Sequence, residues 1–367
     1  MKHLRWILLP ALLAGLLSPA QTERETQDRR LSEIRAKRTR AEQLTAEELE
    51  FLKTVQARRA AEFAQGNPPR ESTGLIPLTD LSTGAHKGEQ GGLYRGGANQ
   101  APPAHMKSGV EIAGRIAPLD PQGRKSEEGK IVLVSIGMSN TTQEFQVFQK
   151  LAAHDSEVSK KILLVDGAQG GQAADTTANP QAKFWQVVEQ RLGTAGATDK
   201  QVQVVWLKQA IIAPSQPFPA EARRLSGYLV ETLHNLAGRF PNLKIAYLSS
   251  RIYGGYALTP LNPEPFAYED AFAIKWLIAD QISEKPELNY HPARGPVRSP
   301  WLAWGPYLWA DGIKGRKDGL VYLREDLEAR DGTHPSMAGR EKVAKLLLDF
   351  LKTHPTARPW FVHGPAS

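Results

Sequence analysis

The segment Asp331-Gly-Thr-His334 has a spacing that suits acid–base chemistry. It lies directly before the last segment in which apolar residues recur with a helical period. An aspartate three residues before a histidine in a tight turn can accept the Nδ1 proton of the imidazole ring. That contact fixes the tautomer, so Nε2 is left to act as a general base towards a serine. Two other interpretations stay open: a helix cap beside an incidental histidine, or two metal ligands that lack a well-spaced third.

A serine far upstream has the position that a nucleophile needs. Ser139 follows the apolar segment 131–136 on a short turn before a predicted helix, and Thr141 and Glu144 have capping-box spacing. A hydroxyl there lies near backbone N–H groups and the positive end of a helix, which stabilise an oxyanion. On the turn alone, a structural serine is the commoner interpretation. The distant Asp–His turn shifts the balance towards a serine hydrolase with the chain order Ser, Asp, His.

The elements around these residues predict where they meet. Four Val/Ile/Leu-rich runs alternate with helical patterns from residue 129 on: runs at 131–136, 161–165, 202–207 and 243–248, helices near 141–151, 184–192, 220–239, 268–282 and 337–351. This alternation predicts an α/β fold of three layers, α/β/α, with a central parallel sheet. Ligands bind such sheets beyond the carboxyl ends of the strands, which is where the first run delivers Ser139.

Residues 129–355 resemble the SGNH or GDSL-like hydrolases. The block that starts at Asp331, Asp-Gly-Thr-His-Pro-Ser, is similar to the family's Asp-Gly-x-His-Pro block. The block that starts at Gly137, Gly-Met-Ser-Asn, is similar to the Gly-Gln-Ser-Asn version of carbohydrate acetylesterase branches. The resemblance implies a flavodoxin-like SGNH fold and an esterase in which Ser139, His334 and Asp331 are catalytic. It requires no metal and no organic cofactor.

The resemblance also implies an oxyanion hole that includes the Ser139 N–H. The family's second block supplies a glycine N–H, a role that falls here on Gly171, with Gly170 as the fallback, because a side chain would block the substrate. The glycine spacing fits neither the Rossmann nor the P-loop pattern. The third block departs from the family, since Gln209 stands where an asparagine is expected. Gln209 is either the third oxyanion donor or a polar residue at a strand end.

Substrate-binding residues are expected after the later strands. Arg251 and Tyr253 follow the fourth run, where an arginine can meet a substrate carboxylate or pair with a local acid. An aromatic group can stack on a sugar or form a core under a loop-like stretch: Trp301, Trp304, Tyr307 and Trp309. Trp304 is the member predicted to bind substrate. We expect an O-acetyl or short-acyl carbohydrate ester. The alternatives are a non-catalytic saccharide-binding or scaffold protein, and a lipid or thioester hydrolase.

The N-terminus has the pattern of a signal peptide over residues 1–20. Lys2 and Arg5 precede an apolar run from residue 6 to residue 17, shorter than the roughly 20 residues of a spanning helix, and small residues follow. We therefore expect an exported protein, periplasmic or secreted, without a stable membrane span after cleavage; an uncleaved anchor is the alternative. The formal charge of +7 falls to +5 without those two cations, which gives no reason to expect nucleic acid. The chain has no cysteine, so disulfides and cysteine-ligated metals are excluded.

The rest of the chain divides by composition. Residues 21–66 form a densely charged helical extension, in which Thr45 and Glu48 have capping-box spacing and Leu31 and Ile34 are too sparse to bury much surface. Residues 67–128, rich in Gly, Pro and Ser, are expected as a leader packed on the main domain. The hydrolase domain spans 129–355, and 356–367 is a tail.

Overall fold

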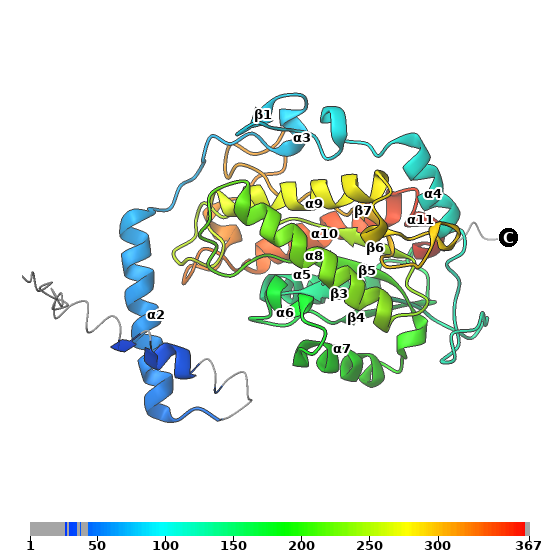
Figure 1. Cartoon of the computed structure of the whole chain (residues 1–367), viewed down its shortest axis with the longest axis horizontal. Coiled ribbons are helices and arrows are strands. Elements are labelled where there is room, and N and C mark those ends of the chain that lie inside the picture. Colours follow the sequence, from blue (N-terminus) through cyan, green and yellow to red (C-terminus); the bar gives the residue numbers. More distant parts are fainter. Residues whose placement is uncertain (1–25, 28, 35–36, 38–42, 364–367) are drawn as a thin grey trace, which may run out of the picture. The chain divides into compact units, whose positions relative to one another are not determined.

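The computed structural model describes residues 26–27, 29–34, 37 and 43–363, and it divides the chain into two compact units, Met1–Glu62 and Phe63–Ser367. The expected signal peptide, residues 1–20, and the end of the tail, residues 364–367, lie outside the described residues. Across the described ranges, no helix combines the length and the apolarity needed to cross a membrane. The two units are described one after the other, and the chain is drawn in Figure 1.

The first unit contains most of helix α2 (Ala46–Gly66). The predicted capping box is confirmed: Thr45 N donates to Glu48 Oε2 (2.9 Å), and Glu48 N donates to Thr45 Oγ1 (3.1 Å). The expectation that Leu31 and Ile34 bury little is wrong, because they form a small core with Leu52 and Val55 of α2. Residues 29–34 are helical and supply the apolar surface on which the apolar face of α2 packs. A single amphipathic helix has no such partner surface.

A five-stranded parallel sheet forms the centre of the second unit, in the order β4–β3–β5–β6–β7. The strands are β3 (Ile131–Gly137), β4 (Ile162–Asp166), β5 (Val202–Lys208), β6 (Ile245–Leu248) and β7 (Trp301–Trp304). The predicted α/β class is thereby confirmed, and the strand order is that of flavodoxin-like folds. From β3 the chain moves first to β4 at one edge and then to β5 on the other side. The crevice expected for a ligand lies at this reversal, beyond the carboxyl ends of β3 and β5.

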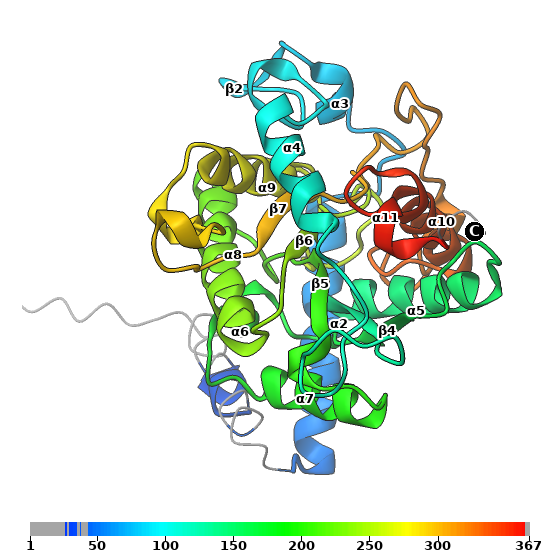
Figure 2. The ribbon, with the colours of Figure 1, turned by 90° about the vertical axis from the view of Figure 1, so that its right-hand side faces the viewer.

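Helices cover both faces of the sheet. Figure 2 shows α6, α8 and α9 on one side of the strands and α5 and α10 on the other. The helices that follow or connect the strands are α5 (Ser139–His154), α6 (Ala174–Ala178), α7 (Lys183–Thr194), α8 (Ala220–Arg239), α9 (Phe266–Ile282), α10 (Met337–Thr353) and α11 (Arg358–Phe361). Short 3-10 turns lie at Arg95–Gly97, Asp199–Gln201, Pro286–Leu288, Pro292–Arg294 and Arg324–Asp326. Burial on both faces explains why the strands are apolar throughout.

The fifth strand corrects the loop-like interpretation of residues 301–309. Trp301 and Trp304 begin and end β7, and the aromatic cluster is buried in the main core, with Trp301 0%, Trp304 3%, Tyr307 5% and Trp309 0% exposed. The core interpretation therefore holds over sugar stacking. The segment Trp-Leu-Ala-Trp lacks the Val/Ile/Leu-rich run that identifies the other strands in the sequence.

Residues 67–128 belong to the second unit and cover the β7 edge of its sheet. They contain α3 (Leu78–Leu81), the two-stranded β1 (Ala85–His86) and β2 (Glu89–Gln90), and α4 (Pro103–Ala113). His105 of α4 stacks on Trp301 with ring centroids 4.7 Å apart. A Cβ on Gly109 would lie 2.3 Å from the same indole, so only glycine permits this approach.

Candidate active site

Ser139, His334 and Asp331 form one chain of hydrogen bonds. Ser139 Oγ lies 2.8 Å from His334 Nε2, and His334 Nδ1 lies 2.7 Å from Asp331 Oδ2. The other carboxylate oxygen, Oδ1, accepts the backbone N–H groups of Thr333 and His334, both at 2.9 Å. The three predicted residues thus come together across 195 positions of sequence in the order that proton transfer from a serine requires.

Contacts with neighbouring loops fix the turn that carries the acid and the base. Gly332 has φ 61°, and a Cβ there would lie 1.8 Å from the Tyr256 carbonyl oxygen, so the turn accepts only glycine. Leu258 N donates to the Asp331 carbonyl at 2.8 Å. Asn140, next to the serine, donates to the Thr333 carbonyl at 2.9 Å, so the nucleophile turn and the Asp–His turn are directly tied together.

Electrostatics keep the carboxylate of this chain ionised. Burial raises the pKa of Asp331, but hydrogen bonds from the His334 ring, the His334 N–H and the Thr333 N–H outweigh it and bring the pKa to about 2. An ionised Asp331 holds the proton on Nδ1, which leaves the Nε2 lone pair facing the Ser139 hydroxyl. This is the protonation pattern of a general base poised on a nucleophile.

The serine lies at the first residue of α5, and this start corrects the predicted capping box. The helix begins at Ser139, before Thr141. Thr141 Oγ1 donates instead to the Lys208 carbonyl (2.8 Å), and Glu144 pairs with Lys208 Nζ (2.6 Å to Oε1) in the core. Both polar side chains face β5 rather than the helix terminus, because α5 packs on the sheet along that side. They anchor the nucleophile helix to the strand beside it.

Two exposed glycines lie beside the nucleophile at the end of β4. A Cβ on Gly170 would lie 3.9 Å from Ser139 Cβ, and Gly171 has φ 73°, a conformation that favours glycine. Within the described part of the chain, neither glycine N–H has a hydrogen-bond acceptor. The loop therefore presents backbone donors near Ser139, and Gly170 is the one that the structure places in contact range of it.

Asp166 holds this loop in place, a role that sequence reasoning missed. Its Oδ1 accepts from Ser135 Oγ of β3 (2.7 Å) and from Ala168 N (3.2 Å), and its other oxygen accepts from Thr142 Oγ1 of α5. Arg191 donates to the Asp166 and Ala168 carbonyls, each at 2.8 Å. An aspartate that ends a strand directly before a glycine-rich turn was the signal available in the sequence.

The side-chain amide of Gln209 is hydrogen-bonded to the protein itself. Its Nε2 donates to the Gln172 carbonyl (3.0 Å) and to Thr177 Oγ1 (3.4 Å), and the side chain is buried. Both amide hydrogens are thus taken in this structure. Gln209 ties the end of β5 to the Gly-rich loop and to α6, and the oxyanion role predicted for it has no free donor here.

Two of the predicted substrate-binding residues contact the leader instead. The Tyr253 hydroxyl donates to the Arg70 carbonyl (2.7 Å), and the Trp304 indole donates to the Leu93 carbonyl (2.9 Å). Both side chains are buried, and Trp304 lines a cavity of about 810 Å³ that no member of the Ser–His–Asp chain lines. Only Arg251 stays close to the acid–base turn, within electrostatic range of Asp331.

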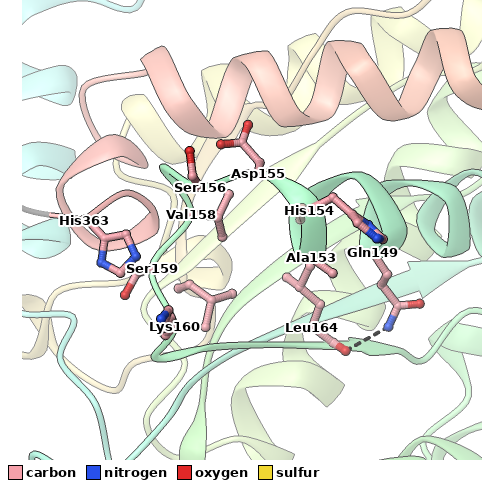
Figure 3. Close-up of a pocket in the computed structure, with 12 residues that line it drawn as sticks. Gln149, Ala153, His154, Asp155, Ser156, Val158, Ser159, Lys160, Leu164 and His363 are labelled. Atoms are coloured by element: carbon pink, nitrogen blue, oxygen red, sulfur yellow. Dashed lines mark hydrogen bonds between the residues drawn. The ribbon is translucent and has the colours of Figure 1, made fainter.

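A separate cavity of about 400 Å³ lies at the far end of α5. Figure 3 shows His154, Asp155, Lys160 and His363 around it, where α5 ends and β4 begins. Ser139 and His154 are the first and last residues of α5, so about 22 Å of helix separates this cavity from the nucleophile. Among the described residues, no three His, Asp or Glu side chains are grouped so that they could hold a metal ion.

Comparisons with known proteins give weak likenesses only. No family profile and no curated protein matches the sequence. The structure of a Bacillus subtilis protein matches with 13% identity and TM-score 0.34. The match covers 62% of this chain and 59% of the Bacillus subtilis chain. A Bacteroides fragilis protein assigned as an acylhydrolase matches with 13% identity and TM-score 0.34, over 68% and 96% of the two chains. The periplasmic domain of a Salmonella Paratyphi A lipopolysaccharide acetyltransferase matches with 11% identity and TM-score 0.33, over 67% and 95%. At these values the likenesses carry no conclusion about activity.

Proposed function

We propose that the chain is a serine hydrolase of the SGNH type that cleaves esters by acyl transfer. The observation that carries the proposal is the hydrogen-bonded chain Ser139–His334–Asp331 at the carboxyl edge of a parallel sheet. The ionised Asp331 and the backbone donors around it give the imidazole one tautomer and one orientation. A structural serine and an incidental histidine would not require this alignment.

The reaction follows from the positions of the protons. Ser139 Oγ attacks the ester carbonyl carbon while His334 Nε2 takes the hydroxyl proton, and the oxyanion forms beside the N–H groups of Ser139 and Gly170 or Gly171. His334 then gives its proton to the leaving alcohol oxygen as the ester C–O bond breaks. Water attacks the acyl carbon while His334 Nε2 takes its proton, and His334 then returns a proton to Ser139 Oγ as the acyl C–Oγ bond breaks and the acid is released. Asp331 stays ionised throughout.

The finer assignments are part of the proposal. A carbohydrate ester with a short acyl group is supported by the likeness of the block that starts at Gly137 to carbohydrate acetylesterase branches. The aromatic cluster no longer contributes to that choice, because its rings lie in the core. Export to the periplasm or the medium is supported by the signal-like residues 1–20. N-terminal sequencing of the mature protein tests export, and an N-terminus near Gln21 is the expected result.

The test of the chemistry is the hydrolysis of 4-nitrophenyl acetate by wild type, Ser139→Ala and Ser156→Ala. We expect Ser139→Ala to lose at least about 10³-fold in kcat with an unchanged melting temperature. Ser156, an exposed serine beside the distal cavity of Figure 3, is the matched control and should keep wild-type turnover. Equal turnover in Ser139→Ala and wild type would refute the proposal.

The two alternatives give different results in related assays. A saccharide-binding or scaffold protein would show no serine-dependent turnover in any of the three proteins. A lipid or thioester hydrolase would prefer long acyl chains or acyl thioesters in a chain-length series, whereas a short-acyl esterase should be fastest with acetyl.

A further inference from the structure

Arg251 is a buried cation without a partner. It follows β6 and is 3% exposed, yet its guanidinium makes no hydrogen bond, and no carboxylate oxygen of the described residues lies within 4.0 Å of it. Its Nε is buried and has no acceptor. Its two terminal nitrogens also lack an acceptor among the described residues but keep some exposure to solvent. A buried charge without a partner is costly, so such a group is retained where a partner arrives from outside.

Other unpartnered polar atoms share the segment with Arg251. Among the described residues, four buried side-chain polar atoms that lack a partner belong to residues 250–262: Ser250 Oγ, Arg251 Nε, Thr259 Oγ1 and Asn262 Oδ1. Each buried polar group without a partner destabilises the folded state. Because native folds keep such groups few, their concentration in one segment marks a place arranged for polar atoms that the chain does not supply.

This segment lies against the acid–base turn. Leu258 N donates to the Asp331 carbonyl, and the Tyr256 carbonyl is the contact that restricts position 332 to glycine. Arg251 itself interacts electrostatically with Glu144 first, then with the two carboxyls on the α9 side, and also with Asp331. The unpartnered guanidinium is therefore part of the surroundings of the proposed reaction centre, not of a remote surface.

The charged groups that face Arg251 leave its charge without a dedicated counterion. Glu144 is engaged by Lys208, and Asp331 is engaged by the His334 ring and two backbone N–H groups. Two further carboxyls lie on the α9 side and are engaged as well: the partly buried Glu264 accepts from Trp309 Nε1 (2.7 Å), and the buried Asp270 accepts from Asn262 Nδ2 (3.1 Å). Burial raises the pKa of Glu264 to about 7 and the pKa of Asp270 well above its usual range, although the Arg251 charge opposes the shift of Asp270.

We propose that Arg251 is the specificity-determining residue of the site and binds a carboxylate carried by the ester substrate. The inference rests on the proposed esterase function, which it narrows to anionic esters. A guanidinium offers two parallel N–H donors that match the two oxygens of a carboxylate. One guanidinium, with Lys208 already engaged by Glu144, suits a single negative charge.

The test measures binding, so that its outcome is separable from that of catalysis. Ser139→Ala, which leaves the ester intact, is titrated by calorimetry with two matched pairs of acid and amide. Methyl hydrogen succinate against methyl succinamate places the charge on the acyl side. 3-Acetoxybenzoate against 3-acetoxybenzamide places it on the alcohol side. We expect one acid to bind at least about tenfold tighter than its amide, the effect of one charge-assisted hydrogen bond.

Arg251→Gln in the Ser139→Ala background should reduce that ratio of acid to amide affinity to about one. Arg124→Gln, a matched change of an exposed arginine paired only with nearby residues, should leave the ratio unchanged. If Arg251→Gln fails to fold, Arg251→Lys replaces it, and the ratio should fall severalfold because the two-donor geometry is lost.

Two results would overturn the proposal: equal affinities for acid and amide in both pairs, or a preference that survives the change at Arg251. Turnover assays answer the other question. A wild-type protein that binds the acid selectively but hydrolyses neither ester would refute the esterase function and leave the carboxylate site standing.

Discussion

Replacing Asp331 with asparagine tests the tautomer control on which the mechanism depends. The structure fixes which way the new amide must face. The oxygen in the Oδ1 position accepts two backbone N–H groups at 2.9 Å, and the atom in the Oδ2 position lies 2.7 Å from His334 Nδ1. An amide nitrogen in the first position would face two donors, so the substituted asparagine would direct its nitrogen to the imidazole ring.

The magnitude follows from that orientation. Each backbone hydrogen bond contributes about 0.5–1.5 kcal/mol, and a buried donor left facing another donor costs about 1–3 kcal/mol. These values favour the amide nitrogen beside His334 Nδ1. Nδ1 then accepts a hydrogen bond from the amide, so the imidazole takes the tautomer that is protonated on Nε2. Protonated Nε2 cannot take the Ser139 proton. The same exchange in chymotrypsin-like triads lowers kcat about 10⁴-fold, about 5 kcal/mol of barrier, and we expect a similar loss here.

The assay is the steady-state hydrolysis of 4-nitrophenyl acetate from pH 5 to pH 9, with thermal unfolding as the check on folding. Asp280→Asn, a change on the outer part of α9, is the matched control and should keep wild-type rates. A folded Asp331→Asn protein that retains more than about a tenth of wild-type kcat would refute the tautomer argument.

Three further predictions concern stability and access. Lys208→Met should lower the free energy of unfolding by about 3–5 kcal/mol in urea melts, because it leaves Glu144 charged and buried, and the double change with Glu144→Leu should recover most of it; equal losses would contradict this. Gly170→Ala should raise stability by about 0.4–1 kcal/mol yet slow ester turnover, since the new methyl lies next to Ser139, and unchanged kcat/KM would count against the site. Burial raises the pKa of Glu264 from 4.5 to about 7, so its stabilising contribution is complete below pH 4.5 and is lost as the pH rises to about 7. Glu264→Gln should remove roughly 3 kcal/mol of this pH dependence, measured by urea melts at pH 4.5 and pH 8, and an identical pH dependence in the variant would contradict the assignment.

The layered fold was predictable because its strands are buried on both faces. Segment 131–136 reads as a continuous apolar run, and a helical period follows it, so the strand, the turn and the nucleophile helix were all expected. The strand β7 was not, because its segment Trp-Leu-Ala-Trp lacks a Val/Ile/Leu-rich run and its tryptophans suggested a binding loop. Its burial depends in part on α4, which is distant in sequence.

In the candidate site, the contacts that are local in the sequence were predictable, and those that depend on distant partners were not. Asp331 and His334 are three residues apart, so local geometry predicts their contact. Gln209 and Tyr253 depend on tertiary partners, the Gly-rich loop and the leader, which no local pattern reveals. The position of Asp166 at a strand end was visible in the sequence, but its partners come from separate elements, so its role was not.

Covalent labelling of the intact protein with a fluorophosphonate tests the central claim most directly. The probe phosphonylates a serine hydroxyl only when a general base activates it, and peptide mass spectrometry identifies the modified residue. The account predicts one label per chain, on Ser139, and at least about 10³-fold slower labelling in a folded His334→Ala variant. An unlabelled wild type, or labelling of Ser139 at the same rate without His334, would contradict it.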